Sequence, residues 1–226
     1  MHGDLLEILY EDNHLLAVVK PAGLPTMGTR GDRPTLLAVA KEYVKLRYEK
    51  PGNVYLGAMS RLDAPVSGVV LLARTSKAAR RMTEQFRSHL VGKSYWALVE
   101  GCIRPSAGEY VDWVGQDERH RRMHIVGPKL PGAKQARMSY RRLADFTDHS
   151  LLEVTLETGR KHQIRLQFSH RGHPILGDRK YGGRRQWPVG IALHARRLVI
   201  THPVRGETLS LEAPLPDAWR EFGIAG

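Results

Sequence analysis

Short β-prone runs joined by turn-like clusters constrain the fold of this chain more than any other feature of its sequence. Residues 5–10 and 15–20 are two such runs, and the Glu-Asp-Asn cluster at 11–13 between them predicts a β-hairpin. Further strands are predicted at 54–59, 68–73, 94–100, 137–146, 151–157, 192–201 and 209–211. Because these runs follow one another as hairpins more than they alternate with helices, a mostly antiparallel sheet is expected.

Two helices are predicted among these strands. Residues 34–48 begin with a proline, which the first turn of a helix tolerates, and apolar residues such as Ala40 and Val44 recur at helical spacing. A second helix is expected from a cap at Thr75 or Ser76 to about residue 90, shortly before a glycine.

The remaining segments are predicted as loops. Residues 21–33 hold three glycines and two prolines, and 101–136 are rich in Gly, Pro and basic residues, so the latter are expected to be the most irregular part of the chain. No linker or repeat interrupts the pattern. We therefore expect a single α+β domain over residues 1–226, with a mostly antiparallel mixed sheet, flanking helices and loops, and a central cleft.

The net charge of the chain indicates what kind of molecule it binds. The 226 residues include 35 Lys and Arg against 23 Asp and Glu, a formal net charge of +12. Such a surplus favours a polyanion, because each neutralised phosphate releases a condensed counterion. A solvated basic surface and a membrane-surface binder are the alternatives, and we favour nucleic acid.

The cellular setting follows from what the sequence lacks. Cys102 is the single cysteine, so neither an intrachain disulfide nor a cysteine metal cluster is expected, which suits a reducing cytoplasm. The N-terminal segment carries acids where a signal peptide needs a basic region, and no apolar run reaches the length of a membrane span. We expect a soluble cytoplasmic protein with no membrane partner.

Two polar segments punctuated by glycine suggest a folded active site. The first, SRLDAPVSG at 60–68, holds Asp63 two residues after Arg61, with a proline and a glycine following. An isolated Asp is usually a turn or cap residue, but a carboxylate fixed near a guanidinium stays ionised, as a nucleophile must. No Gly-x-Ser-x-Gly elbow, Walker loop or Gly-x-Gly-x-x-Gly fingerprint is found, which removes the best sequence support for hydrolase, NTPase, kinase and methyltransferase functions.

The second segment, TGRKHQIRLQFSHRGHPILGDRKYGG, covers residues 158–183. A glycine turn followed by a short helix and a strand with alternating Ile164, Leu166 and Phe168 are both permitted by its periodicity. A helix here could meet a phosphate or an acid with its positive end. Arg165 on its own would ordinarily be a surface cation.

The histidines at 162, 170, 173 and 194 raise the possibility of a metal site. Their spacing matches no standard zinc pattern, and the neighbouring basic residues would repel a dication. No metal is expected, and we interpret these histidines as contacts to the fold or to a nucleic-acid backbone.

Four segments in the same order carry a resemblance to a known family. SRLDAPVSGVVLLA at 60–73, KSYWALVEG at 93–101, the segment at 156–183 and LHARRL at 193–198 closely resemble the RluA family of pseudouridine synthases, and YEDNHLLAVVKPAGLPT at 10–26 fits the start of the family's fold. The resemblance spans nearly the whole chain. It implies isomerisation of selected uridines in structured ribosomal or transfer RNA, with no cofactor and no metal.

The resemblance also implies roles for individual residues. Asp63 corresponds to the essential catalytic aspartate, Tyr95 to a tyrosine that stacks on the target base, and Arg165 to an arginine that pairs with the catalytic acid. Ile164 is expected to form an apolar wall for the uracil, and Arg61 to fill the gap left when the uridine flips out of the RNA.

Further substrate contacts are expected just before Ile164, at Arg160, His162 and Gln163. The RNA grip is predicted to include the basic segment 119–124 and four arginines at 184, 185, 196 and 197.

The sequence departs from the family pattern around the catalytic acid. The family usually has His where Ser60 stands, and Lys-Asp-Thr where this chain has Ala-Pro-Val at 64–66. The change bears on substrate choice more than on catalysis. Many relatives also carry a small N-terminal RNA-binding domain, for which this chain has no room, and a monomer is expected.

Two other functions remain as alternatives. A non-catalytic RNA-binding or ribosome-assembly protein on the same fold would fit the altered residues after Asp63. A metal-dependent hydrolase would instead use the histidines.

Overall fold

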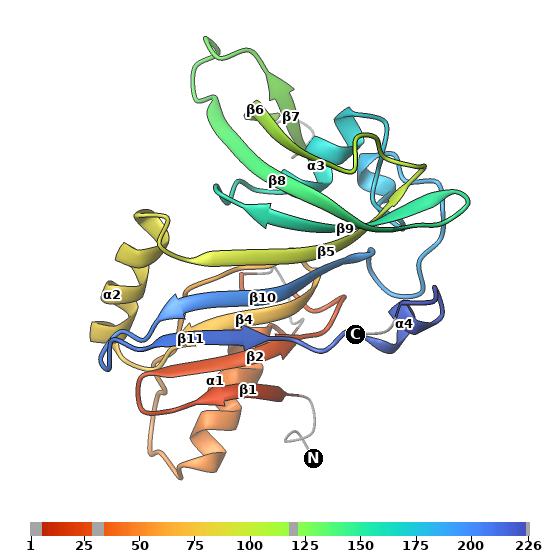
Figure 1. Cartoon of the computed structure of the whole chain (residues 1–226). Helices are drawn as coiled ribbons and strands as arrows, with labels where there is room; N and C mark the ends of the chain where they lie inside the picture. Colours follow the sequence, from red (N-terminus) through yellow and green to blue (C-terminus); the bar gives the residue numbers. More distant parts are fainter. Residues whose placement is uncertain (1–5, 29–33, 118–121, 225–226) are drawn as a thin grey trace. The chain divides into compact units, whose positions relative to one another are not determined.

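The computed structural model describes residues 6–28, 34–117 and 122–224, and within them the chain divides into two compact units (Figure 1). The first unit is built from residues 1–92 together with 195–226, and the second from residues 93–194. The expectation of a single domain stays a prediction.

The first unit is a sheet with helices (Figure 1). Its elements are β1 (Glu7–Glu11), β2 (Leu15–Lys20), α1 (Leu36–Arg47), β3 (Gly57–Ala58), β4 (Ser67–Ala73), α2 (Ser76–Arg87), most of β10 (Leu193–Thr201), β11 (Thr208–Glu212) and α4 (Asp217–Arg220). The strand order is β1-β2-β4-β10, with β3 paired to β4 and β11 to β10. The hairpin predicted from the first twenty residues is confirmed as the antiparallel pair β1–β2.

Strand β4 lies at the centre of this unit. All seven of its residues are buried, and four of the six in its antiparallel partner β2 form a buried run at 15–18. A strand buried on both faces reads as a continuous apolar run, which explains why the sequence 69–73 shows no alternation. The predicted 54–59 strand is much shorter than expected, since only Gly57 and Ala58 pair with β4.

Both predicted helices form, but α1 begins at Leu36, so Pro34 precedes the cap instead of standing in the first turn as expected. The side-chain oxygens of Thr35 and Thr75 accept the backbone N–H groups of Ala38 and Ala78, and so cap the first turns of α1 and α2. Helix α2 ends at Arg87, about three residues earlier than expected.

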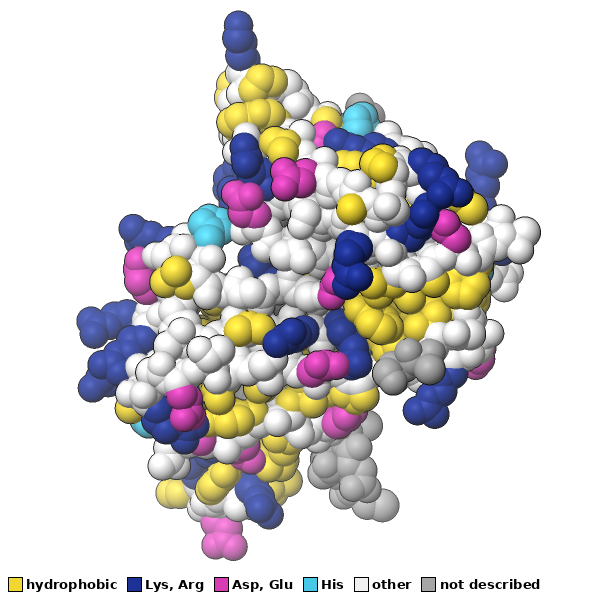
Figure 2. Space-filling model, in the orientation of Figure 1, with side chains coloured by type: hydrophobic (Ala, Val, Ile, Leu, Met, Phe, Trp, Pro, Cys, Tyr) yellow, Lys and Arg dark blue, Asp and Glu magenta, His cyan; other side chains and the backbone are white. Residues whose placement is uncertain are grey.

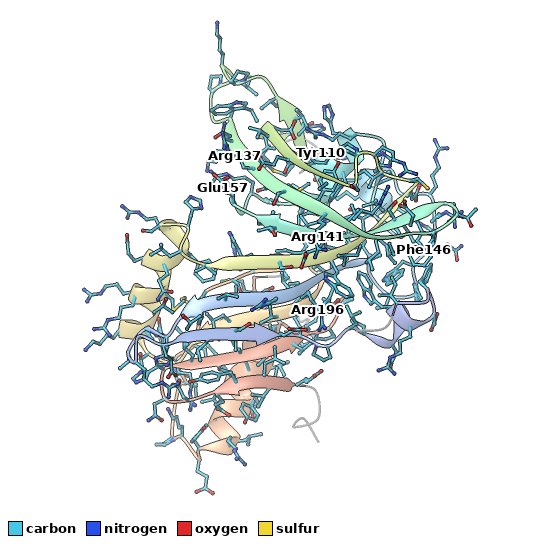
Figure 3. All side chains as sticks on the ribbon, viewed as in Figure 1. Tyr110, Arg137, Arg141, Phe146, Glu157 and Arg196 are labelled. Atoms are coloured by element: carbon cyan, nitrogen blue, oxygen red, sulfur yellow. The ribbon has the colours of Figure 1, made fainter. Side chains whose placement is uncertain are left out.

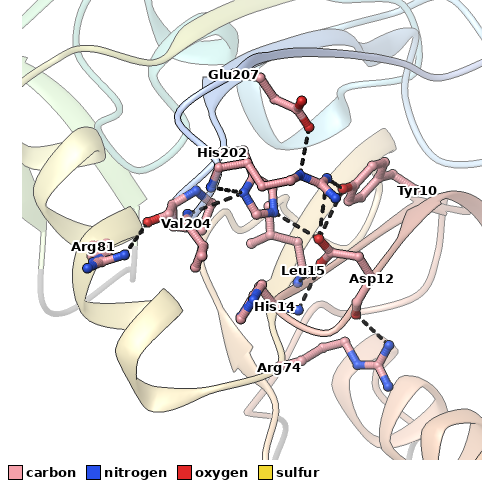
Figure 4. A network of polar contacts seen from close by, with 11 residues as sticks. Tyr10, Asp12, His14, Leu15, Arg74, Arg81, His202, Val204 and Glu207 are labelled. Carbon is pink, nitrogen blue, oxygen red and sulfur yellow. Dashed lines mark hydrogen bonds and ion pairs between the residues drawn. The ribbon is translucent and has the colours of Figure 1, made fainter.

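A polar network joins two turns of the first unit (Figure 4). The buried His202 Nδ1 accepts the N–H groups of Val204 at 3.2 Å and Arg205 at 2.9 Å, so its proton sits on Nε2, which donates to Asp12 Oδ2 at 2.9 Å. Asp12 Oδ1 in turn accepts the N–H groups of His14 and Leu15. The β1–β2 turn is thereby tied to the β10–β11 turn.

The second unit is also a sheet, with one helix packed on it (Figure 1). Its elements are β5 (Gly92–Glu100), β6 (Ala107–Asp117), β7 (Arg122–Val126), β8 (Lys134–Asp145), β9 (His149–Leu156), α3 (Gln163–His170) and the 3₁₀ turn η2 (Arg179–Tyr181). The strands run in the order β5-β9-β8-β6-β7, and each neighbouring pair is antiparallel.

The expectation that residues 101–136 are irregular is wrong, because β6 and β7 occupy much of that segment. The glycines and acids of β6 have low β propensity. The strand forms nevertheless because it pairs along its length with β8 and, at its end, with β7. Tertiary pairing outweighs local preference here.

The structure decides between helix and strand for residues 163–170. They form α3, in which every residue from Gln163 to Phe168 is buried, so the Ile-Leu-Phe alternation carries no information about faces. Phe168 packs edge-on against Tyr110 of β6, with the ring centroids 5.6 Å apart, and against Tyr140 of β8 at 5.8 Å. Figure 3 labels Tyr110. The α+β class is confirmed. No helix among residues 6–28, 34–117 and 122–224 has the length and apolar character of a bilayer-spanning segment.

Candidate functional site

Asp63, in the first unit, is half-buried, and hydrogen bonds hold the backbone on both sides of it. Thr26 Oγ1 donates to the Leu62 carbonyl at 2.8 Å and accepts the Leu62 N–H at 3.1 Å. After the aspartate, the Ala64 carbonyl accepts the Gly23 N–H at 2.7 Å. The loop that follows β2 therefore fixes the residue before and the residue after Asp63.

Lys20 completes this support, and sequence reasoning missed it. The side chain is fully buried at the end of β2, where Nζ donates to the carbonyls of Pro21 at 2.8 Å, Leu24 at 2.7 Å and Ala64 at 3.2 Å. Burial lowers the pKa of Lys20 to about 8, and the negative charge of Asp63 acts in the opposite direction. The available signal was a lysine at the end of an apolar strand, in phase with buried residues two and four positions earlier.

Contacts also hold the two ends of the segment 60–68 that contains Asp63. Ser60 Oγ accepts the Leu71 N–H of β4 at 3.0 Å, which anchors the start of the segment to the central strand. Gly68 has a φ of +119°, and a Cβ there would stand 2.5 Å from the backbone N of Ala195. The turn into β4 therefore requires glycine. Arg61 is exposed.

The other candidate residues lie in the second unit. Tyr95 is half-buried on β5, opposite Val154 of β9. Side chains alternate along a strand, so Tyr95 points to the opposite face from Ser94, whose Oγ donates to Glu153. Ile164 lies in the buried first turn of α3 and is 4% exposed.

Arg165 has a buried partner that the sequence did not reveal. Its Nε donates to Asp178 Oδ2 at 2.7 Å and its Nη2 donates to Asp178 Oδ1 at 2.8 Å, with side-chain exposures of 5% for Arg165 and 1% for Asp178. Such a bidentate pair fixes the plane of the guanidinium. Three of the five N–H groups are not used by Asp178, so the geometry is compatible with donation to a second acid. The predicted pairing with Asp63 stays a prediction.

The turn before α3 is held by Gln163. Its Oε1 accepts the Thr158 hydroxyl at 2.8 Å and the Arg160 N–H at 3.0 Å, and its Nε2 donates to the Arg137 carbonyl at 2.9 Å. The side chain is 3% exposed, so the structure gives Gln163 a scaffold role. Its expected substrate contact stays a prediction.

Tyr181 contacts residues from α3, from the turn before it and from β7. Its hydroxyl lies 2.7 Å from His162 Nδ1 and accepts the Met123 N–H at 3.3 Å, while the Arg165 and Arg122 guanidinium carbons lie 5.1 Å and 5.0 Å from its ring centroid. Burial is the main cause that raises the pKa of Tyr181. His162 itself adopts the left-handed conformation, with φ at 55°. Tyr181 therefore links β7 to both ends of the first turn of α3.

The histidines considered for a metal site have other contacts. His162 meets Tyr181, His173 Nδ1 lies 2.9 Å from the Glu100 carbonyl, and His194 is fully buried. Within the described ranges, no group of three His, Cys, Asp or Glu side chains is placed to hold an ion.

The expected RNA grip is only partly described. Residues 119–121 of the basic segment lie outside the described residues. Arg185 and Arg196 are engaged in ion pairs with Asp148 and Glu212. Figure 2 shows Lys and Arg side chains over the face in view, with acidic side chains between them.

Comparison with known proteins gives consistent results. Residues 14–170 match the model of the RNA pseudouridylate synthase family. The chain is 34% identical to a tRNA pseudouridine synthase C of Salmonella typhimurium, over 98% of this chain and 92% of that relative. It is 36% identical to a ribosomal large subunit pseudouridine synthase D of Pseudomonas aeruginosa, over 94% of this chain and 69% of that relative.

A solved structure shares the fold. The human RNA pseudouridylate synthase domain containing 4 superposes with a TM-score of 0.77 at 28% sequence identity, and the match covers 93% of this chain and 88% of that one.

Proposed function

We propose that this chain isomerises particular uridines of structured RNA with Asp63 as the nucleophile. The chain belongs to the RNA pseudouridylate synthase family, and its motifs resemble those of the RluA members. The observation that carries the assignment of Asp63 is its support. Lys20, at the end of β2, and Thr26, in the loop that follows, hold the residues on both sides of an otherwise ordinary aspartate. A nucleophile has to be positioned to within a fraction of an ångström, and a doubly anchored backbone supplies that.

The reaction is an isomerisation, so nothing is gained or lost overall. The bond from uracil N1 to ribose C1′ breaks, the uracil rotates, and a bond from C5 to C1′ forms. The C5 proton leaves, and N1 takes one up. We propose that the Asp63 carboxylate assists the first step, by attack on the sugar, by promoting a glycal, or by addition to the uracil.

The remaining residues have supporting roles in the proposal. Tyr95 stacks on the base and assists removal of the C5 proton. Arg165 pairs with the catalytic carboxylate, and its bidentate bonds to Asp178 prevent the guanidinium from rotating away. Ile164 provides an apolar surface against the uracil, which helps to keep the freed base from escaping.

The substrate is proposed to be ribosomal or transfer RNA. The named relatives are a tRNA pseudouridine synthase and a ribosomal large subunit pseudouridine synthase, and the net charge of +12 suits binding of either RNA. The uridine must leave the stack before its glycosidic bond can be reached, and the exposed Arg61 is proposed to fill the gap. Arg160 and His162 are proposed to contact the same nucleotide region. We also propose a cytoplasmic monomer.

Tritium release tests this function. RNA labelled with tritium at uracil C5 is incubated with the protein, and exchange of the label into water reports the new C5–C1′ bond. Mapping of pseudouridines in total RNA, with and without the protein, then identifies the position. Binding of RNA with no label released from either ribosomal or transfer RNA would favour the non-catalytic alternative suggested by the altered residues 64–66.

A further inference from the structure

Two cations of the second unit, Lys93 and Arg160, lie close enough for the positive charge of one to act on the other. Lys93 stands two residues before Tyr95 on β5, so the two side chains share a face of the strand, about 7 Å apart along it. Arg160 lies in the turn that leads into α3. The Nζ atom of Lys93 is 3.9 Å from where a Cβ on the neighbouring Gly159 would be. The ammonium therefore lies against this turn.

Lys93 has no partner in the part of the chain that the structure describes. Its Nζ makes neither an ion pair nor a hydrogen bond with the described residues, although the side chain is half-buried. Burial, and then the positive charge of Arg160, lower its pKa. A partly desolvated ammonium beside a like charge is a costly arrangement, and an anion placed between the two charges would relieve it.

Arg160 is held in place by one hydrogen bond from its backbone N–H and one from its side-chain Nε. Its Nε donates to the Gln135 carbonyl at 2.8 Å, and its backbone N–H donates to Gln163 Oε1 at 3.0 Å. The two Nη groups have no partner among the described residues, which leaves a fixed guanidinium with donors to spare. Glu157 is the acid closest to Arg160 in sequence, and its Oε2 lies 3.9 Å from Nη1 of Arg137 (Figure 3).

We propose that Lys93 and Arg160 together bind one phosphate group of the RNA, next to the nucleotide on which Tyr95 acts. The ammonium supplies a compact charge, and the guanidinium supplies directed donors, which together suit a phosphate. Gly159 has no side chain to obstruct the approach. The placement beside Tyr95 rests on the proposed function, whereas the phosphate site itself does not.

The test measures RNA binding rather than turnover. Equilibrium binding to large-subunit ribosomal RNA and to bulk transfer RNA is measured over a range of salt concentrations, in an Asp63→Asn background. The variants are Lys93→Gln, Arg160→Gln and the double variant. Lys161→Gln is the matched control, because Lys161 is an exposed neighbour in the same turn. Thermal melting confirms that each variant is folded.

A shared phosphate has a defined signature. For at least one of the two RNAs, the double variant lowers the slope of log affinity against log salt by about 0.7 to 0.9, the contribution of one phosphate, and each single variant lowers it by less. Lys93→Arg retains the slope. A loss of twice that size would place the cations on separate phosphates, and an unchanged slope, or an equal loss in Lys161→Gln, would overturn the proposal.

The two proposals fail separately. If the wild-type protein releases no tritium but the double variant still loses one phosphate contact, the isomerase assignment fails and the phosphate site stands. If tritium release is normal but the salt slope of the double variant equals that of its parent, the phosphate site fails alone.

Discussion

Asp178→Asn isolates the contribution of the buried pair behind Arg165. The substitution keeps the shape of the side chain but removes its charge and turns one of its two acceptors into a donor, facing a guanidinium that is 5% exposed. Removal of one partner of a buried ion pair costs about 3–5 kcal/mol, because the other charge is left uncompensated. Since one acceptor survives in Asn, a loss of about 3 kcal/mol is expected.

Urea unfolding followed by tryptophan fluorescence measures this loss. With a slope of about 2 kcal/mol per molar urea, the midpoint moves down by about 1.5 M while the slope is unchanged. Asp148→Asn is the control, because Asp148 pairs with Arg185 at an exposed site, and little change is expected there. Tritium release also falls, by about 100-fold, if Arg165 loses its orientation by about an ångström.

A second variant separates charge from packing. Replacing both partners, with Arg165→Met and Asp178→Leu together, recovers most of the lost stability, because an apolar pair leaves no buried charge. It does not recover activity. A midpoint for Asp178→Asn that matches the control, or a double variant less stable than Asp178→Asn, would refute this reasoning.

Three further outcomes are expected. Burial lowers the pKa of Lys20 from 10.5 to about 8, so between these pH values the unfolded chain binds more protons than the folded protein. The contribution of Lys20 to the free energy of unfolding therefore rises with pH in this range. Urea titrations at pH 7.5 and 9.5 show this rise for the wild type and lack it for Lys20→Met. Gly68→Ala lowers the melting temperature far more than Gly206→Ala, since both glycines have positive φ but only an added Cβ at 68 meets the backbone of Ala195; equal losses would show that φ alone matters. Thr26→Val, of similar size, removes both bonds to the residue before Asp63 and lowers kcat in the tritium assay more than it raises KM, and the reverse split would argue against a positioning role.

The sequence predicted what depends on neighbouring residues. The first hairpin, the two helices and the Thr75 cap follow from local patterns, and they are confirmed. The strands β6 and β7 were missed, because their stability comes from pairing with partners rather than from their own composition.

The support of the candidate site was missed for a related reason. Lys20 reaches Ala64, 44 residues away, and Arg165 reaches Asp178, 13 residues away. No periodicity connects such partners, and a charged residue is ordinarily assigned to the surface until a buried acceptor is seen. Motif resemblance identified the candidate reacting groups, whereas the structure identified what holds Asp63 and Arg165 in place.

Tritium release by Asp63→Asn, measured in a single turnover with the enzyme in excess over RNA labelled at uracil C5, tests the central claim most directly. The amide is no nucleophile, yet its side chain is the same size as the carboxylate. We expect no release above the rate without protein, together with RNA affinity within about threefold of the wild-type value, a difference of less than 1 kcal/mol. Label released by this variant at a rate near that of the wild type would contradict the assignment of Asp63 as the nucleophile.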